Sequence, residues 1–448
     1  MTKIRGFING WNTRKHPFIR TKTPDEILTK LTVTLSQIHL TAEPLARPTT
    51  SKPTELVQSR IMNAFDIARI ALGLVVLVGG AELLVRGASS LAARSGLSPL
   101  VIGLTVVAVG TSSPEFAVTV QAVLSDEMDL AIGNVVGSNI VNVLLILGVA
   151  ALILPLAVKR QLVRVDVPVM IVLSVVLLLC ALDGRISATD GLLLLVLWLT
   201  HTIVIVILSR RETVPARPER EERPVPDPGH GNGASTGAAD QRPAAGLGVA
   251  VSVVLIVAGV ALLVAGANLL VSGAVNIATS LGLSGLVIGL TVVAVGTSLP
   301  ELVTTLVAAI RGERDIAIGN IVGSNIANIG LVLAAPALFA NGGIPVAPAA
   351  IALDIPLMVA TALVVFPIVF TGFTVQRWEG ALFVALYVAY LTYLVLDATG
   401  HQALTGFTQT MVFFILPLAL ITLITTVAYD LHRRARKKAF APPEGDSL

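Results

Sequence analysis

The sequence predicts an all-α polytopic membrane protein built from two inverted five-helix repeats, which give ten core transmembrane helices, followed by an eleventh transmembrane helix near the C-terminus. Three observations carry this prediction: the composition, a series of apolar stretches, and a phrase that occurs twice. The chain of 448 residues is 54% hydrophobic with a mean hydropathy of +0.84, and only 13% of its residues are charged. These values exclude a soluble domain. The net charge of +3 gives no reason to expect a nucleic-acid partner.

Eleven apolar stretches recur along the chain, most of them near the roughly 20 residues that a helix needs to cross a bilayer. Five precede a segment rich in Pro, Gly and charge, and six follow it. The stretches are 67–85, 97–124, 130–154, 165–182, 192–208, 247–271, 283–310, 316–339, 349–370, 380–396 and 411–427. The segment between the two groups cannot bury enough apolar surface to fold, so we expect a flexible linker there.

The stretches divide the chain into six parts. The first has no long apolar run and lacks the pattern of a signal peptide, so we expect it to be disordered or absent from a natural chain that starts at Met62. The parts are an N-terminal extension (1–62), the first repeat (63–209), the linker (210–246), the second repeat (247–398), the extra helix (399–432) and a basic tail (433–448).

The phrase VIGLTVVAVGTS occurs unchanged at 101–112 and 287–298. One residue later each copy continues with a proline and a glutamate, at Pro114, Glu115, Pro300 and Glu301. A carboxylate inside a hydrocarbon-compatible run is costly and is by default a functional-site hypothesis. Because five spans separate the copies, the second enters the membrane from the opposite side, as in the inverted repeats of secondary transporters.

Loop charges give an independent indication of this inversion. The loop SDEMD at 125–129 is acidic, whereas its counterpart RGERD at 311–315 carries two arginines. Because positive loops stay inside, we expect an external N-terminus and a cytoplasmic linker and C-terminus, in a bacterial inner (plasma) membrane. In this orientation the basic N-terminal extension lies outside, where the positive-inside rule does not expect basic residues.

The residues of the repeated phrases bring oxygen atoms together. Pro114 removes the backbone donor for the carbonyl of Gly110, and broken helices at membrane depth persist only where they line a cavity or are buried. Thr111 and Glu115 then share one helical face, as do Thr297 and Glu301. Downstream, AIGNVVGSNIVN and AIGNIVGSNIAN add two polar stripes, namely Asn134, Ser138, Asn142 and Asn320, Ser324, Asn328. Oxygen ligands without sulfur or imidazole suit Ca²⁺, Na⁺ or another hard cation, and two carboxylates neutralise one divalent ion.

Structural interpretations compete with functional ones at several positions. Small residues of the second phrase favour close helix packing, at Gly133, Gly137, Gly319 and Gly323. Glu82 is four residues before Arg86 and predicts an ion pair. Asp166 and Asp354 each precede a proline by two residues and are interpreted as helix-start residues, and His201 as a packed or snorkelling side chain. The single cysteine, Cys180, excludes disulfides within the chain.

The paired motifs identify a family. GTSSPE with GNVVGSNIVN, and GTSLPE with GNIVGSNIAN, resemble the two alpha repeats of the calcium/cation antiporter superfamily, most closely the prokaryotic sodium/calcium exchangers. The resemblance covers about 67–398 and implies ten core helices with four ion sites near the midplane, no cofactor, and a transporter rather than an enzyme. By motif position it implies the ligands Ala108, Thr111, Ser112, Glu115, Ser138, Asn142, Ala294, Thr297, Ser298, Glu301, Ser324 and Asn328.

The resemblance implies a calcium exporter that exchanges Ca²⁺ for Na⁺ by alternating access, with 73–86 and 259–272 as the moving pair. Some relatives carry an aspartate at the position of Asn328, so this chain has two carboxylates and not three. Three Na⁺ would then leave one positive charge uncompensated, and Ca²⁺/H⁺ antiport on the same two glutamates is the alternative. A cation channel is a third possibility. An intramembrane hydrolase using Ser112 or Ser298 lacks a nearby histidine or lysine.

Overall fold

The computed structural model describes residues 53–212, 248–281, 292, 294–370 and 372–439. The chain divides at Met62, and every contact discussed below lies within Asn63–Leu448. Most of the predicted N-terminal extension, the linker from residue 213 and the tail from residue 440 lie outside the described residues.

The first repeat forms five membrane-spanning units, which match the five apolar stretches predicted before the linker. The second of these is a pair of helices bent by 46° at Ser112. The helices are α3 (Pro53–Ser95), α4 (Pro99–Ile102), η1 (Gly103–Val107), α5 (Ala108–Thr111), α6 (Ser113–Leu124), α7 (Met128–Ile140), η2 (Val141–Leu147), α8 (Gly148–Ile153), η3 (Leu162–Asp166), α9 (Val167–Ala181) and α10 (Ala188–Glu212), where η marks a π-helical turn.

The second repeat follows the same plan, and an additional helix ends the described chain. Its helices are α11 (Val249–Ser280), α13 (Ala294–Thr297), α14 (Leu299–Ile310), α15 (Arg314–Ala327), η5 (Asn328–Leu333), α16 (Ala334–Ala337), η6 (Ala350–Asp354), α17 (Ile355–Phe370) and α18 (Arg377–Ala398). The additional helix is α19 (Leu404–Thr410), η7 (Met411–Ile415) and α20 (Leu416–Ala439).

The predicted fold class is confirmed. Among the described residues, nine helices are long and apolar enough to cross a membrane, and the bent pair of the first repeat makes a tenth span. The remaining predicted span, 283–310, is described mainly from Ala294 onward. Two ends differ from the predicted divisions: α10 continues to Glu212, into the predicted linker, and α20 continues to Ala439, into the predicted tail.

Two short sheets, which the sequence did not indicate, connect the repeats at the ends of the helices. β1 (Leu156–Ala157) pairs antiparallel with β4 (Thr374–Val375), and β2 (Arg185–Ile186) pairs antiparallel with β3 (Ile344–Pro345). Each sheet therefore takes one strand from each repeat, so that backbone hydrogen bonds join a loop of the first repeat to a loop of the second.

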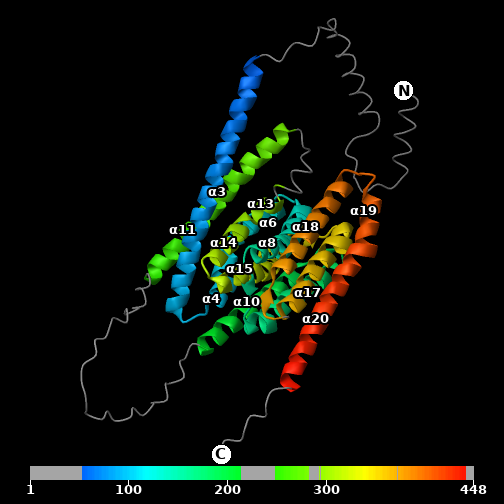
Figure 1. The fold of residues 1–448 in the computed structure, drawn as a ribbon. Helices are drawn as coiled ribbons and strands as arrows, with labels where there is room; N and C mark the ends of the chain where they lie inside the picture. The colour runs from blue at the N-terminus through cyan, green and yellow to red at the C-terminus, as the bar shows by residue number, and fades with distance from the viewer. Residues whose placement is uncertain (1–52, 213–247, 282–291, 293, 371, 440–448) are drawn as a thin grey trace, which may run out of the picture. The chain divides into compact units, whose positions relative to one another are not determined.

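The long helices α3 and α11 lie side by side (Figure 1) and meet through glycine. Three glycines in α3 and three in α11 recur every seven residues, which keeps them on one face of each helix: Gly73, Gly80, Gly87, Gly259, Gly266 and Gly273. A Cβ placed on any of these six would come within 2.6 to 2.9 Å of atoms of the facing helix. Glycine is required here because the two backbones pass too close for any side chain.

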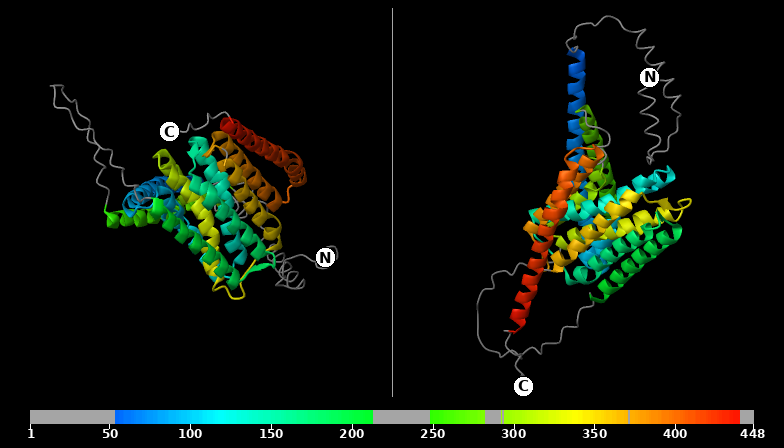
Figure 2. Two further views of the ribbon diagram at one scale, coloured as in Figure 1. Left: turned by 90° about the horizontal axis from the view of Figure 1, so that it is seen from below. Right: turned by 90° about the vertical axis from the view of Figure 1, so that its right-hand side faces the viewer.

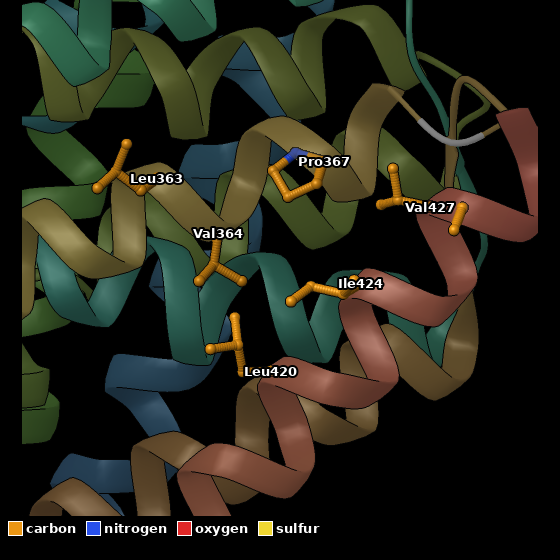
Figure 3. Close-up of a pocket in the computed structure, with 7 residues that line it drawn as sticks. Leu363, Val364, Pro367, Leu420, Ile424 and Val427 are labelled. Atoms are coloured by element: carbon orange, nitrogen blue, oxygen red, sulfur yellow. The ribbon is translucent and has the colours of Figure 1, made fainter.

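The additional helix lies at the edge of the bundle, beside α17 and α18 (Figures 1 and 2). Between α20 and α17 is an apolar groove of about 460 Å³ (Figure 3). Its walls are Leu363, Val364 and Pro367 from α17 and Leu420, Ile424, Val427 and Ala428 from α20. With no charged or hydroxyl side chain, this groove does not suit an ion, and the polar side chains of the bundle gather elsewhere.

Candidate ion-binding site

The first repeated phrase folds into a helix that breaks at Ser112, and the described end of the second phrase, Ala294–Thr297, is followed by a break at Ser298. Ser112 and Ser298 stand at the breaks, and the prolines occupy the first turn of the following helices, where a missing N–H costs nothing. Glu115 and Glu301 occupy the same first turns of α6 and α14. The positive end of each helix dipole therefore lies beside a carboxylate.

The carboxylates of the two repeats are held by one another's helix breaks. The hydroxyl of Ser112 donates to Oε1 of Glu301 at 3.0 Å, and the hydroxyl of Ser298 donates to Oε1 of Glu115 at 3.3 Å. Both glutamates are fully buried. The inverted repeats thus bring their acidic side chains into one site, to which each repeat contributes a carboxylate and the hydroxyl that holds the other.

Asparagines from α7 and α15 support the backbone below the breaks. The Asn134 amide donates to the Glu115 carbonyl oxygen at 3.0 Å and to the Thr119 hydroxyl at 2.9 Å. The Asn320 amide makes the same two contacts with Glu301 and Thr305, at 3.4 and 3.1 Å. These two members of the predicted polar stripes therefore position the acidic residues.

Other predicted ligands bond to these supporting residues or lie on the adjoining helical segments. The Thr111 hydroxyl donates to the carbonyl oxygen of Ala108 at 3.2 Å and to Oδ1 of Asn320 at 3.0 Å, and lies 3.4 Å from the hydroxyl of Ser324. Ala294 and Thr297 form the ends of α13, directly before the second break. Asn142 lies within η2, and Asn328 is the first residue of η5. Such single π-helical turns occur often at functional sites.

Five oxygen atoms of these residues are buried with no hydrogen-bond partner in the described part of the chain. They are Oε2 of Glu115, Oε2 of Glu301, Oγ of Ser138, Oδ1 of Asn142 and Oδ1 of Asn328. Buried polar atoms are nearly always paired, and leaving one unpaired costs about 1–3 kcal/mol. Two carboxylate oxygens, two amide oxygens and a hydroxyl form a donor set that fits a hard cation. No group of three or more His, Cys, Asp or Glu side chains gathers in the described residues.

Comparison with known proteins agrees with this geometry. The model of the sodium/calcium exchanger protein family matches residues 65–207 and 251–396, which are the two repeats. The chain belongs to this family. It is therefore an integral membrane cation antiporter of the calcium/cation antiporter superfamily, and the predicted family is confirmed.

Individual relatives extend over most of the chain. Inner membrane protein YrbG of Escherichia coli (strain K12) is 36% identical over 66% of this chain and 86% of its own length. Sodium/calcium exchanger MaX1 of Methanosarcina acetivorans is 35% identical over 72% of this chain and 97% of its own. Among solved structures, the sodium-calcium exchanger NCX_Mj matches with a TM-score of 0.59 and 32% identity, covering 73% of this chain and 98% of that one.

Sequence reasoning missed two residues of the site in this exchanger. Asn139 and Asn325 are buried, and their amide oxygens accept from the candidate ligands Asn328 and Asn142, respectively. A signal was present, because both copies of the second phrase read GSN. The predicted stripe occupies positions i, i+4 and i+8, and these asparagines lie one residue beyond its central serine.

Polar residues outside the site have mixed outcomes. The predicted ion pair between Glu82 and Arg86 is confirmed at 2.7 Å, and Glu82 also pairs with Arg311. The interpretation of Asp166 as a helix-start residue was wrong: its side chain makes no cap and instead lies 3.0 Å from Nε2 of His201, with both side chains buried. His201 is thus packed inside the bundle. Asp354 ends the π-helical turn η6.

Proposed function

We propose that this antiporter exchanges Ca²⁺ for Na⁺ by alternating access, using the site between the two helix breaks. The observation that carries the proposal is the set of five buried oxygens with no hydrogen-bond partner in the part of the chain that the structure describes, each on a residue that the motif resemblance assigns as a ligand. The remaining ligands would be Thr111, Ser112, Thr297, Ser298 and Ser324, with the backbone oxygens of Ala108 and Ala294.

The charge of the site supports coupling between the two ions. Glu115 and Glu301 together carry two negative charges when ionised, and both are fully buried. Burying uncompensated charge is strongly unfavourable, so an empty site does not close easily. One Ca²⁺ or two Na⁺ neutralise the pair, and closure is then possible from either loaded state. Competition for the same carboxylates makes the exchange obligatory.

Relatives support the choice of substrates. MaX1 is named a sodium/calcium exchanger, and NCX_Mj was studied in the presence of Na⁺ and Ca²⁺. Protons are the alternative counter-ion, because two protons would neutralise the same two carboxylates. The position of Asn328 bears on this choice, because an amide adds no third charge for Na⁺.

The helices α3 and α11 are proposed as the moving pair. They meet through glycines, and a polar contact joins them at each end of the crossing. The hydroxyl of Ser252 donates to that of Ser90 at 3.0 Å, and the amide of Asn276 donates to the carboxylate of Asp66 at 2.9 Å. These contacts support movement of the two helices as one unit across the site.

We place the protein in a bacterial inner membrane, with the N-terminus outside and the linker and C-terminus in the cytoplasm. The name of YrbG, an inner membrane protein, supports the compartment. The distribution of arginine between the loops supports the orientation.

Flux of radioactive calcium in proteoliposomes tests the proposal. A sodium gradient is expected to drive Ca²⁺ uptake at constant pH, and replacing sodium with choline is expected to abolish it. Uptake driven by a pH gradient without sodium would instead establish Ca²⁺/H⁺ exchange. Calcium conductance with no dependence on a counter-ion would show a channel and contradict alternating access.

A further inference from the structure

Asn139 and Asn325 lie where the central helices α7 and α15 of the two repeats meet. Each is 2% exposed. Neither belongs to the ligands implied by the family motifs, but each is bonded to the amide of a candidate ligand on the opposite repeat. A methionine lies behind each of them, Met358 behind Asn139 and Met170 behind Asn325.

The first chain of contacts starts at Asn142. Its Nδ2 donates to Oδ1 of Asn325 at 3.1 Å. Nδ2 of Asn325 in turn donates to the sulfur of Met170 at 3.5 Å. Three residues from two repeats thus form one line of donors and acceptors that ends at a thioether.

The second chain is related to the first by the inverted repeat. Nδ2 of Asn328 donates to Oδ1 of Asn139 at 3.0 Å. Nδ2 of Asn139 donates to the sulfur of Met358 at 3.6 Å and to the backbone carbonyl oxygen of Asn325 at 3.3 Å. This second chain therefore ends at two acceptors, the sulfur of Met358 and the carbonyl oxygen of Asn325.

The chemistry of these end groups gives each chain a direction. A thioether sulfur and a backbone carbonyl accept hydrogen bonds and never donate them. Asn325 must therefore turn its amino group toward Met170 and its carbonyl oxygen toward Asn142. Asn142 must then use its own amino group on Asn325. Its carbonyl oxygen is left on the other side, buried and without a hydrogen-bond partner among the described residues, and the same holds for Asn328.

We propose that Asn139 and Asn325, together with Met170 and Met358, are positioning residues that fix the two ligand amides with oxygen toward the ion. An amide has almost the same shape when turned by 180°, so packing alone does not select its orientation. A turned amide would direct two N–H donors at a cation and repel it. The two chains of hydrogen bonds, here called relays, exclude that orientation. This inference rests on the proposed cation site.

Replacing Met170 with leucine tests the first relay. The substitution keeps volume and apolar character but removes the acceptor, so the orientation of Asn325 is no longer selected. A neutral hydrogen bond contributes about 0.5–1.5 kcal/mol, so the KM for Ca²⁺ is expected to rise about two- to tenfold, with the maximal rate at saturating Ca²⁺ unchanged. Met128→Leu, in a half-buried methionine at the start of α7, is the matched control and is expected to leave KM unchanged.

A double-mutant cycle separates positioning from a packing defect. Met170→Leu acts through Asn142, so it is expected to add nothing to the KM of Asn142→Ala. It is expected to add its full effect to the KM of Asn328→Ala, which belongs to the other relay. A packing defect would add equally to both. Met358→Leu is expected to raise KM less, because the amide of Asn139 keeps a second acceptor in the backbone carbonyl oxygen of Asn325; Asn328→Ala is its insensitive background.

The outcomes distinguish the relay from the function on which it rests. If the unchanged protein shows no calcium flux under any gradient, the proposed function fails. If it transports calcium while Met170→Leu, confirmed as folded by thermal unfolding, keeps the normal KM, the relay is refuted. Equal effects in both single-ligand backgrounds would also refute it.

Discussion

Exchanging the Glu301 carboxylate for an amide is the most direct perturbation of the site. Oε1 of Glu301 accepts from Ser112 at 3.0 Å, and the carbonyl oxygen of a glutamine can accept the same bond. The glutamine amino group would then occupy the place of Oε2, an atom with no hydrogen-bond partner among the described residues. Glu301→Gln therefore keeps the contact between repeats but places two N–H donors where a cation would bind.

The size of the effect follows from burial. Removing one partner of a buried charge pair costs about 3–5 kcal/mol. At about 1.4 kcal/mol per factor of ten, this corresponds to roughly 10²- to 10³-fold weaker Ca²⁺ binding. The increase in melting temperature that Ca²⁺ gives to the unchanged protein is expected to disappear, along with calcium uptake into proteoliposomes. The melting temperature without Ca²⁺ is expected to remain the same or rise, because one buried charge has been removed.

Glu82→Gln is the matched control, since Glu82 is also a carboxylate in a membrane-spanning helix. It pairs with arginines and is partly exposed, and such pairs contribute about 0–1 kcal/mol. Calcium flux and Ca²⁺-dependent melting are expected to persist. Normal calcium affinity and flux in Glu301→Gln would refute the assignment of the site.

Three further predictions concern packing, a buried pair and charge. Gly80→Ala places a Cβ 2.8 Å from the backbone nitrogen of Leu263 in α11, and is expected to lower stability by about 1–3 kcal/mol and to slow exchange. Gly79→Ala is the control, because its Cβ meets no described atom within 4 Å, and it is expected to change neither quantity. Thermal unfolding and flux measure both. His201→Gln removes the ring nitrogen that lies 3.0 Å from the buried Asp166 side chain and is expected to lower stability by about 1–3 kcal/mol. Adding Asp166→Asn is expected to restore most of this stability in thermal unfolding, because the carboxyl group that lost its partner is then also removed. Finally, if two carboxylates limit the bound charge to two positive charges, exchange of two Na⁺ for one Ca²⁺ moves no net charge across the membrane. Potassium diffusion potentials set with valinomycin are then expected to leave the initial rate of calcium uptake unchanged. A strong dependence of that rate on the potential would indicate a third Na⁺.

Repetition explains why so much of this fold could be predicted from sequence. A span is recognised by its length and hydropathy, and two identical phrases separated by five spans are necessarily inverted. The pairing of Ser112 with Glu301 is a different matter. Symmetry predicts that the phrases meet, but which atoms bond depends on the 46° bend at Ser112, and no local pattern specifies that angle.

The sequence interpretation fails where the partner of a residue lies on a different helix, because spacing along the chain indicates only neighbours on the same helix. Asp166 was interpreted from its spacing to the next proline, whereas its partner is 35 residues away on α10. The glycines of the second phrase show the same limit. Gly319 and Gly323 make the predicted close approach, because a Cβ added at either would lie 2.8 or 2.6 Å from a backbone oxygen of the first repeat. A Cβ added at Gly133 or Gly137 would meet no described atom within 4 Å, and the predicted approach at these two glycines remains a prediction.

The contrast between two kinds of contact indicates where movement costs least. At the site, each carboxylate depends on a serine of the other repeat, and each ligand amide depends on an asparagine of the other repeat. Displacing one repeat against the other there would break directed bonds between buried groups, which is costly. Between α3 and α11, by contrast, the closest contacts are backbone against glycine, and the polar contacts that join α3 to the second repeat outside this pair, Glu82 with Arg311 and Ser89 with Glu313, are partly exposed. The helix pair α3 and α11 can therefore move past the ion site without breaking the hydrogen bonds that hold the site together. We therefore expect access to the ions to change by displacement of α3 with α11, while the oxygen cage keeps its geometry.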